Sequence, residues 1–144
     1  MSLSDAADRL FLGRDPRLAI KLSSVAGVAF LLTALVHLPP RLVGSLSTPF
    51  GLFLPALFAL MFVLSVVGGY LNDGLLVCVA LAGGPSLGYY LPLAIFELTY
   101  PSETVLRALA TGTGYAVVFG AAGFLVGAGG RRLVGRVRAA VAAA

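Results

Sequence analysis

The stretch ALAGGPSLGYYLPL, residues 80–93, decides how the fold is interpreted, because it places glycines and prolines inside a long apolar segment. It contains three glycines, two prolines, one serine and two tyrosines. In a membrane, such a stretch is either a bent helix packed closely on a neighbour or a broken helix that offers backbone groups to a ligand. The surrounding sequence and the spacing of its small residues distinguish the two.

The chain around this stretch is far more apolar than a soluble domain. Of its 144 residues, 59% are hydrophobic and 11% are charged, whereas soluble domains average about 45–50% apolar and 25% charged residues. The apolar residues form four long runs, at 18–38, 50–71, 75–96 and 108–129. Each is close to the ~20 residues that a helix needs to cross ~30 Å of hydrocarbon. The sequence therefore predicts an all-α protein, a single bundle of four transmembrane helices.

Positive charge is concentrated near the two ends of the chain. Eight of the ten Lys and Arg residues lie at 9–21 or 131–138. Four crossings put both ends on the same side, so the excess of positive charge predicts that both termini are cytoplasmic, in the plasma membrane. The first run exceeds the apolar region of a signal peptide and no A-x-A-like site follows it, so we expect it to remain as a span.

Three segments between and beyond the runs have their own signals. Residues 3–12 place apolar side chains on one helical face, which predicts a short amphipathic helix at the cytoplasmic surface or, alternatively, a frayed tail. The YLNDG sequence at 70–74 is typical of a tight turn, with Asp73 as a turn residue. Residues 131–144 form a basic tail that flanks a span, so its charge indicates anionic lipid rather than nucleic acid. The arginines expected to contact headgroups are Arg131, Arg132, Arg136 and Arg138.

Few side chains are suited to chemistry. Cys78 lies in an apolar run, which predicts neither a disulfide framework nor a thiolate metal site. A single histidine gives no zinc-ligand spacing, and no nucleophile, phosphate or cofactor motif is present in the sequence. We therefore expect a protein that is not an enzyme and has no cofactor or metal. The candidate polar site, at the outer ends of the spans and beside them, is His37, Glu97, Tyr89 and Tyr90.

Small residues recur every four positions in the third and fourth runs. Such rows let two helix backbones approach closely in a membrane. The rows in the fourth run lie on faces roughly 60° apart, so we expect that helix to pack on two neighbours, one of them the third helix with its own row. The predicted packing residues are Ala80, Gly84 and Gly88 in the third run, and Gly112, Ala116, Gly120, Gly123 and Gly127 in the fourth.

The prolines of the third run each remove one backbone hydrogen bond. Pro85 and Pro92 therefore predict a kinked helix, with a discontinuous helix lining a small site as the open alternative. A transporter built on inverted repeats would show a matching interruption in its other half. In the first two runs Gly27 and Pro55 are the candidate interruptions, and they do not match the pattern of the third run, which favours the kink.

The sequence has several rows of small residues suited to helix packing and few side chains suited to catalysis. This combination predicts a structural, assembly or accessory subunit of a membrane complex. Its expected partners are the lipid bilayer and either other membrane subunits or a second copy of the chain. One alternative is a small transporter or channel that acts as an oligomer. Another is a lipid-modifying enzyme whose site lies at the outer interface around His37 and Glu97.

Overall fold

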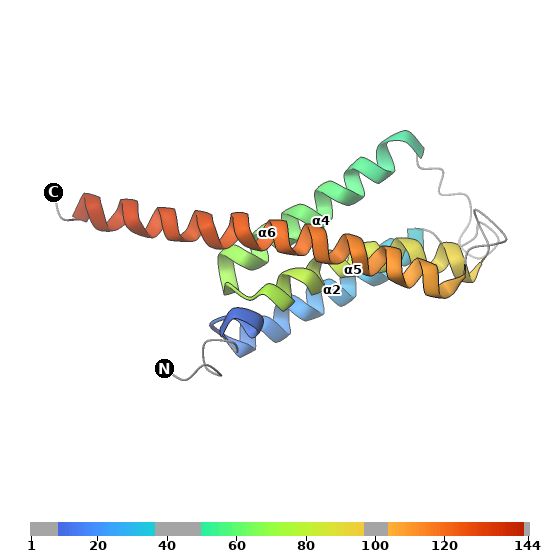
Figure 1. The fold of residues 1–144 in the computed structure, drawn as a ribbon, viewed down its shortest axis with the longest axis horizontal. Helices are drawn as coiled ribbons and strands as arrows, with labels where there is room; N and C mark the ends of the chain where they lie inside the picture. Colours follow the sequence, from blue (N-terminus) through green and yellow to red (C-terminus); the bar gives the residue numbers. More distant parts are fainter. Residues whose placement is uncertain (1–8, 37–49, 97–103, 143–144) are drawn as a thin grey trace.

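The computed structural model describes residues 9–36, 50–96 and 104–142. These parts of the chain form helices α2 (Pro16–Val36), α4 (Phe50–Asn72), α5 (Leu75–Ile95) and α6 (Val105–Ala142), arranged as in Figure 1. Each of the four is long and apolar enough to cross a membrane. The prediction of an all-helical chain with four helices of membrane-spanning length is therefore confirmed.

Local sequence explains where these helices begin and end. Asp15 caps α2, because its Oδ1 accepts a hydrogen bond from the Arg17 amide at 2.9 Å, and Pro16 occupies the first helical position. α4 ends where Asp73 adopts a positive φ of 59°, a conformation that Asp, Asn and Gly tolerate better than other residues. Two residues then separate α4 from α5, so these helices form an antiparallel hairpin.

The predicted amphipathic segment at 3–12 falls partly within the described residues. Residues 9–12 are helical, and Gly13 follows with a φ of 89°. Residues 3–8 of the segment lie outside the described part of the chain.

α5 is the central helix of the bundle. It packs against α2, α4 and α6, and α4 also packs on α6. Over its most apolar window, 56% of α5 is buried, compared with 17% for α2 and 22% for α6. The segment with the unusual glycine and proline content is therefore the one around which the others assemble.

The helical backbone of α5 continues through both of its prolines. Pro85 and Pro92 lie inside the helix and are buried. Their positions remove two hydrogen bonds from the ladder but do not divide the helix. The discontinuous-helix alternative is therefore wrong.

Two buried serines link α5 to its neighbours. Ser86 Oγ donates a hydrogen bond to the Gly112 carbonyl oxygen of α6 at 2.9 Å. Ser65 Oγ of α4 lies 3.0 Å from the Cys78 carbonyl oxygen of α5. Hydrogen bonds of this kind hold helices together where water cannot compete.

The glycine row of α5 lies against α2. A Cβ atom on Gly88 would lie 2.5 Å from the Phe30 carbonyl oxygen, and one on Gly84 would collide with the Ala26 carbonyl oxygen. The expectation that this row faces the fourth helix is therefore wrong. Ala80, predicted as the first member of the packing row, is exposed rather than packed.

The adjacent face of α5 meets α6. A Cβ atom on Gly120 would lie 2.6 Å from Val79 Cα, and Gly112 lies against the Leu87 side chain. These contacts on α5 lie one position, or about 100° around the helix, from the row that faces α2. Ala116, between the two glycines of α6, is 2% exposed. The backbones of α5 and α6 therefore approach as closely as those of α5 and α2.

The second glycine row of α6 lies against α4. Gly123 and Gly127 face residues 65–70, and a Cβ atom on Gly127 would lie 2.7 Å from the Tyr70 amide nitrogen. The two small-residue rows of α6 thus contact two different helices.

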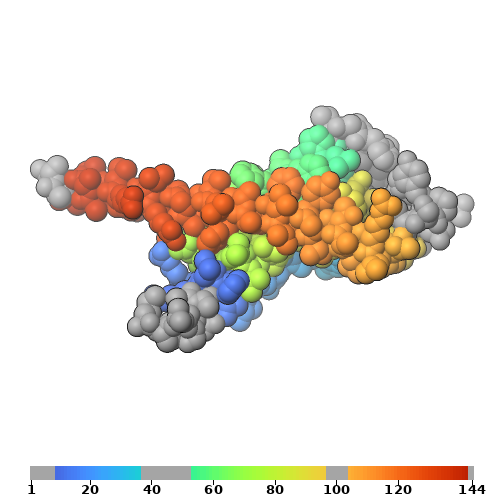
Figure 2. All heavy atoms as spheres, in the orientation of Figure 1, coloured from blue at the N-terminus to red at the C-terminus, as the bar shows by residue number. Residues whose placement is uncertain are grey.

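α6 continues well past the other helices. The sequence suggested a span ending at 129 followed by a separate tail, whereas α6 stays helical through Gly129 and Gly130 to Ala142. Each glycine lowers helix stability by only ~1 kcal/mol, which a long helix tolerates. The 38 residues of α6 extend about 57 Å at 1.5 Å per residue. Figures 1 and 2 show its C-terminal part standing clear of the bundle.

Candidate functional site

The two tyrosines of the predicted polar site belong to an aromatic cluster. The Tyr89 ring packs on Phe53 of α4 with centroids 5.7 Å apart, and the Tyr90 ring stacks on Tyr115 of α6 at 5.8 Å. The two tyrosines meet edge to face at 5.0 Å. These rings join α4, α5 and α6 by ordinary aromatic packing. The other residues of the predicted site lie outside the described part of the chain: His37 and Glu97.

A polar junction forms where the N-terminal segment meets the end of α4. Its centre is Asn72, whose side chain is fully buried (0% exposed). Asn72 Nδ2 donates to the Leu12 carbonyl oxygen at 2.9 Å, and Oδ1 accepts from the Asp15 amide at 3.1 Å. The Asn72 carbonyl oxygen accepts from the Arg14 amide at 2.9 Å. One residue thus fixes the start of α2 against the α4–α5 turn.

The backbone in this junction is packed too closely for larger side chains. A Cβ atom on Gly13 would lie 2.5 Å from Asn72 Nδ2, and one on Gly74 would lie 2.9 Å from the Gly13 amide nitrogen. Gly13 also has a positive φ, which glycine adopts without strain.

Two arginine side chains approach the Asp73 carboxylate from different parts of the chain. Arg14 Nη2 donates to Asp73 Oδ2 at 3.1 Å, and Arg132 Nη2 of α6 lies 4.0 Å from Oδ1. The side chain of Asp73 is 13% exposed, compared with 53% for Arg14 and 68% for Arg132. Asp73 therefore does more than form a turn, because it connects the N-terminal segment to α6.

Arg131 positions the neighbouring turn of α6. Its Nη1 donates to the carbonyl oxygens of Tyr70 at 3.1 Å and Leu71 at 2.9 Å. The last carbonyls of a helix have no intrahelical partner and carry partial negative charge, so a guanidinium suits them. Arg131 was expected only at lipid headgroups, whereas the structure uses it to hold α6 against the end of α4.

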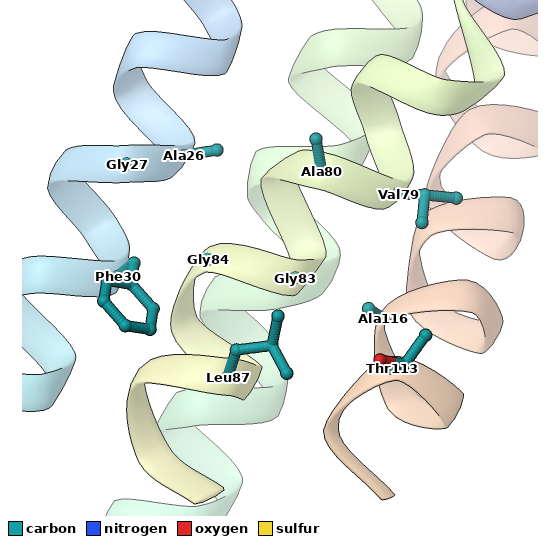
Figure 3. A pocket seen from close by; sticks show the side chains of 10 residues that line it. All are labelled: Ala26, Gly27, Phe30, Val79, Ala80, Gly83, Gly84, Leu87, Thr113 and Ala116. Atoms are coloured by element: carbon teal, nitrogen blue, oxygen red, sulfur yellow. The ribbon is translucent and has the colours of Figure 1, made fainter. Parts of the chain in front are cut away.

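An apolar groove lies along α5 between α2 and α6 (Figure 3), with a volume of about 380 Å³. Small side chains form its floor and the α6 wall, while Phe30 and Leu87 close one end. Its lining residues are Ala26, Gly27 and Phe30 of α2, Val79, Ala80, Gly83, Gly84 and Leu87 of α5, and Thr113 and Ala116 of α6.

A second pocket of about 660 Å³ follows the same α2–α5 seam toward the N-terminal segment. It shares Ala80 with the first groove and ends at Leu12 and Pro16. Beside that end, a polar pocket of about 440 Å³ is lined by Arg9, Arg14 and Asp73.

The described residues bring together no group of three or more His, Cys, Asp or Glu side chains that could hold a metal ion. No family model, no curated protein and no solved structure matches this chain. Its function is therefore inferred from the geometry of its own residues.

Replacing Asn72 tests the polar junction. In Asn72→Leu, the Leu12 carbonyl oxygen and the Asp15 amide lose their partners, which costs about 1–3 kcal/mol for buried groups. We expect amide hydrogen exchange in residues 12–15 of the detergent-solubilised protein to accelerate by roughly tenfold or more, measured by mass spectrometry. Ser24→Ala is the control, since Ser24 Oγ is exposed and donates only within its own helix, to Ile20. Unchanged exchange in Asn72→Leu would contradict the assigned role.

Proposed function

We propose that this chain is a non-enzymatic subunit, an assembly or accessory protein of a membrane complex. The observation that carries the proposal is the C-terminal part of α6, which projects beyond the bundle (Figure 1). Its large apolar side chains are exposed, with Leu133 at 63%, Val137 at 62% and Val141 at 72%. An exposed apolar stripe on a helix is typical of a surface that binds a partner.

The projecting part of α6, residues 131–142, is amphipathic. At 100° per residue, Leu133, Val134, Val137 and Val141 fall within an arc of about 100°. The remaining sides carry four arginines and no acidic residue. This combination favours a partner that offers an apolar groove with acidic edges. The basic residues are Arg131, Arg132, Arg136 and Arg138.

The length of α6 favours a protein partner for the last turns. Arg131 is held at the end of α4 by its bonds to Tyr70 and Leu71. Val141 lies ten residues further along the same helix, or about 15 Å. The headgroup layer on each side of the bilayer is only about 5–8 Å thick. In this proposal Arg132 lies at the level of the anionic headgroups, and the stripe that includes Val137 and Val141 stands beyond it.

The use of polar groups inside the bundle supports a role without catalysis. Ser86 is buried, and its hydroxyl is donated to the Gly112 carbonyl oxygen. The Tyr89 and Tyr90 rings pack against Phe53 and Tyr115, which favours the structural role over the transporter or channel alternative. We further propose that α5 bends at its prolines, since each proline ring crowds the preceding turn.

A charge placed on the apolar stripe tests the proposed role. In mild detergent, we expect the native chain to migrate in a complex larger than its own mass, together with at least one other protein. Val137→Asp buries a charge in that interface and should weaken the complex more than tenfold. The measurement is native gel electrophoresis followed by mass spectrometry of the band.

Ala139→Asp is the matched control, because position 139 lies on the side of α6 opposite the apolar stripe and is also exposed. It adds the same charge without touching the stripe, so the complex should persist. Equal losses in both variants would contradict a specific interface. A complex that contains only this chain would replace the proposed subunit role with self-assembly.

We also propose that both termini face the cytoplasm across the plasma membrane. The support is the charge distribution, since eight of the ten Lys and Arg residues lie at 9–21 or 131–138. A reporter that is active only in the cytoplasm, fused after Ala144, should therefore be active. The same reporter inserted in the 37–49 segment should be silent, and the reverse pattern would invert the topology.

A further inference from the structure

Two pockets lie in succession along the α2–α5 seam, and together they are called the seam groove. They share Ala80, and their lining positions recur every three or four residues on a single face of each helix, as expected for neighbours along a helix. On α2 the lining includes Pro16, Ile20, Ser23, Gly27 and Phe30, and on α5 it includes Leu76, Ala80, Gly83 and Leu87.

The length of this seam groove matches one leaflet of a bilayer. From Leu76 to Leu87 it follows α5 for about 16 Å, and from Pro16 to Phe30 it follows α2 for about 21 Å. Half of the hydrocarbon core is about 15 Å thick. A helix from a second copy or another subunit would need a surface that continues across both leaflets, about 30 Å long. A single extended acyl chain therefore fits the length of the seam groove better than a transmembrane helix does.

The lining of the seam groove suits an acyl chain. Its membrane-depth part is formed by apolar side chains and glycines, with Thr113 as the polar lining residue there. Polar lining returns toward the N-terminal segment, where Ser23 and Ser24 border the second pocket. An apolar interior followed by hydroxyl groups parallels the chemistry of a phospholipid from its acyl chain to its ester region.

Positive charge lies at the mouth of the seam groove. The groove ends at Leu12, two residues before Arg14, and a separate polar pocket is lined by Arg9, Arg14 and Asp73 from the same segment and the α4–α5 turn. Arg14 of the N-terminal segment and Arg132 of α6 approach Asp73, yet both remain more than half exposed. Three arginines against one carboxylate leave two net positive charges for an anionic headgroup.

We propose that the seam groove binds one anionic phospholipid from the leaflet on the side of the chain termini. Its acyl chain lies along α5 from Leu76 to Leu87, and its phosphate contacts the exposed sides of the Arg14 and Arg132 guanidinium groups. The acyl-chain part of the site shares no residue with the apolar stripe on the projecting part of α6, and Arg132 is common to both proposals, so Gly27 separates the lipid from the partner.

Gly27 gives a direct test of the acyl-chain position. A Cβ atom on Gly27 meets nothing within 4 Å, so Gly27→Leu fills the seam groove without disturbing the bundle. Gly114 is equally open but lies outside the groove, so Gly114→Leu is the matched control. Native mass spectrometry of the delipidated protein, titrated with phosphatidylglycerol or phosphatidylcholine, measures binding. We expect one tight phosphatidylglycerol, weakened roughly tenfold by Gly27→Leu and unchanged in Gly114→Leu.

The headgroup contact is tested by neutralising Arg132. Arg132→Gln should reduce the preference for phosphatidylglycerol over phosphatidylcholine roughly tenfold, since one charge-assisted contact is lost. Arg138→Gln removes the same charge from the projecting part of α6 and should leave the preference unchanged. The Arg132 and Arg138 side chains are both exposed on the surface, so we expect both variants to fold.

Three results would overturn the proposal. Equal affinities in Gly27→Leu and Gly114→Leu would show that the seam groove does not hold the lipid. An unchanged lipid preference in Arg132→Gln would place the headgroup elsewhere. Conversion of a dimer to a monomer by Gly27→Leu would show that a second copy occupies the groove.

Discussion

The bundle depends on close backbone contact along two adjacent faces of α5. Gly84 and Gly88 let α2 approach until its carbonyl oxygens occupy the space of a missing Cβ, and Gly120 of α6 leaves the same space for the Val79 backbone of α5. Within a membrane the lipid is as apolar as the side chains, so burial of apolar surface drives little helix association and van der Waals contact must replace it. Short contacts between backbones supply that attraction. The Ser86 hydroxyl adds a hydrogen bond from α5 to α6, and the Ser65 hydroxyl of α4 lies within hydrogen-bond distance of a carbonyl oxygen of α5. The high burial of α5 follows from this arrangement.

The same constraint produces the seam groove. α2 and α6 contact α5 on faces about 100° apart. Part of the α5 surface between these two helices therefore stays open as a groove, and Ala80 and Gly83 line it. At the end near the chain termini the seam groove opens beside the polar junction, where Asn72 holds the start of α2 and Asp73 pairs with arginines from both sides. Apolar packing in the membrane and polar bonds at its edge therefore converge on the α4–α5 hairpin.

Much of this fold could be predicted from the sequence, because membrane-spanning runs and tight turns have strong local signals. The four helices and the turn at Asp73 were predicted from such local signals. Four-residue spacing predicted which helix faces carry small residues. Spacing gives no information about which neighbouring helix such a face contacts, so the row at Gly84 was assigned to the wrong helix. Asn72 was missed because its side-chain partners lie 57 and 60 positions away and no local pattern marks them. The helical projection of α6 was missed because a Gly-Gly pair before arginines resembles the end of a span. His37 and Glu97 remain predictions.

The register of α5 against α6 is the most direct test of the whole arrangement. In a Cys78→Ala background, the Gly83→Cys/Ala116→Cys pair brings together Cβ positions that lie 3.5 Å apart, within the range of about 3.5–4.5 Å for disulfides. Gly83→Cys/Gly114→Cys is the control, because position 114 is exposed on another side of α6. Mild oxidation in the membrane, followed by a gel-shift assay of free thiols, should show nearly complete bridging in the first pair and almost none in the second. Absent bridging in the first pair, or equal bridging in both, would contradict the close α5–α6 contact.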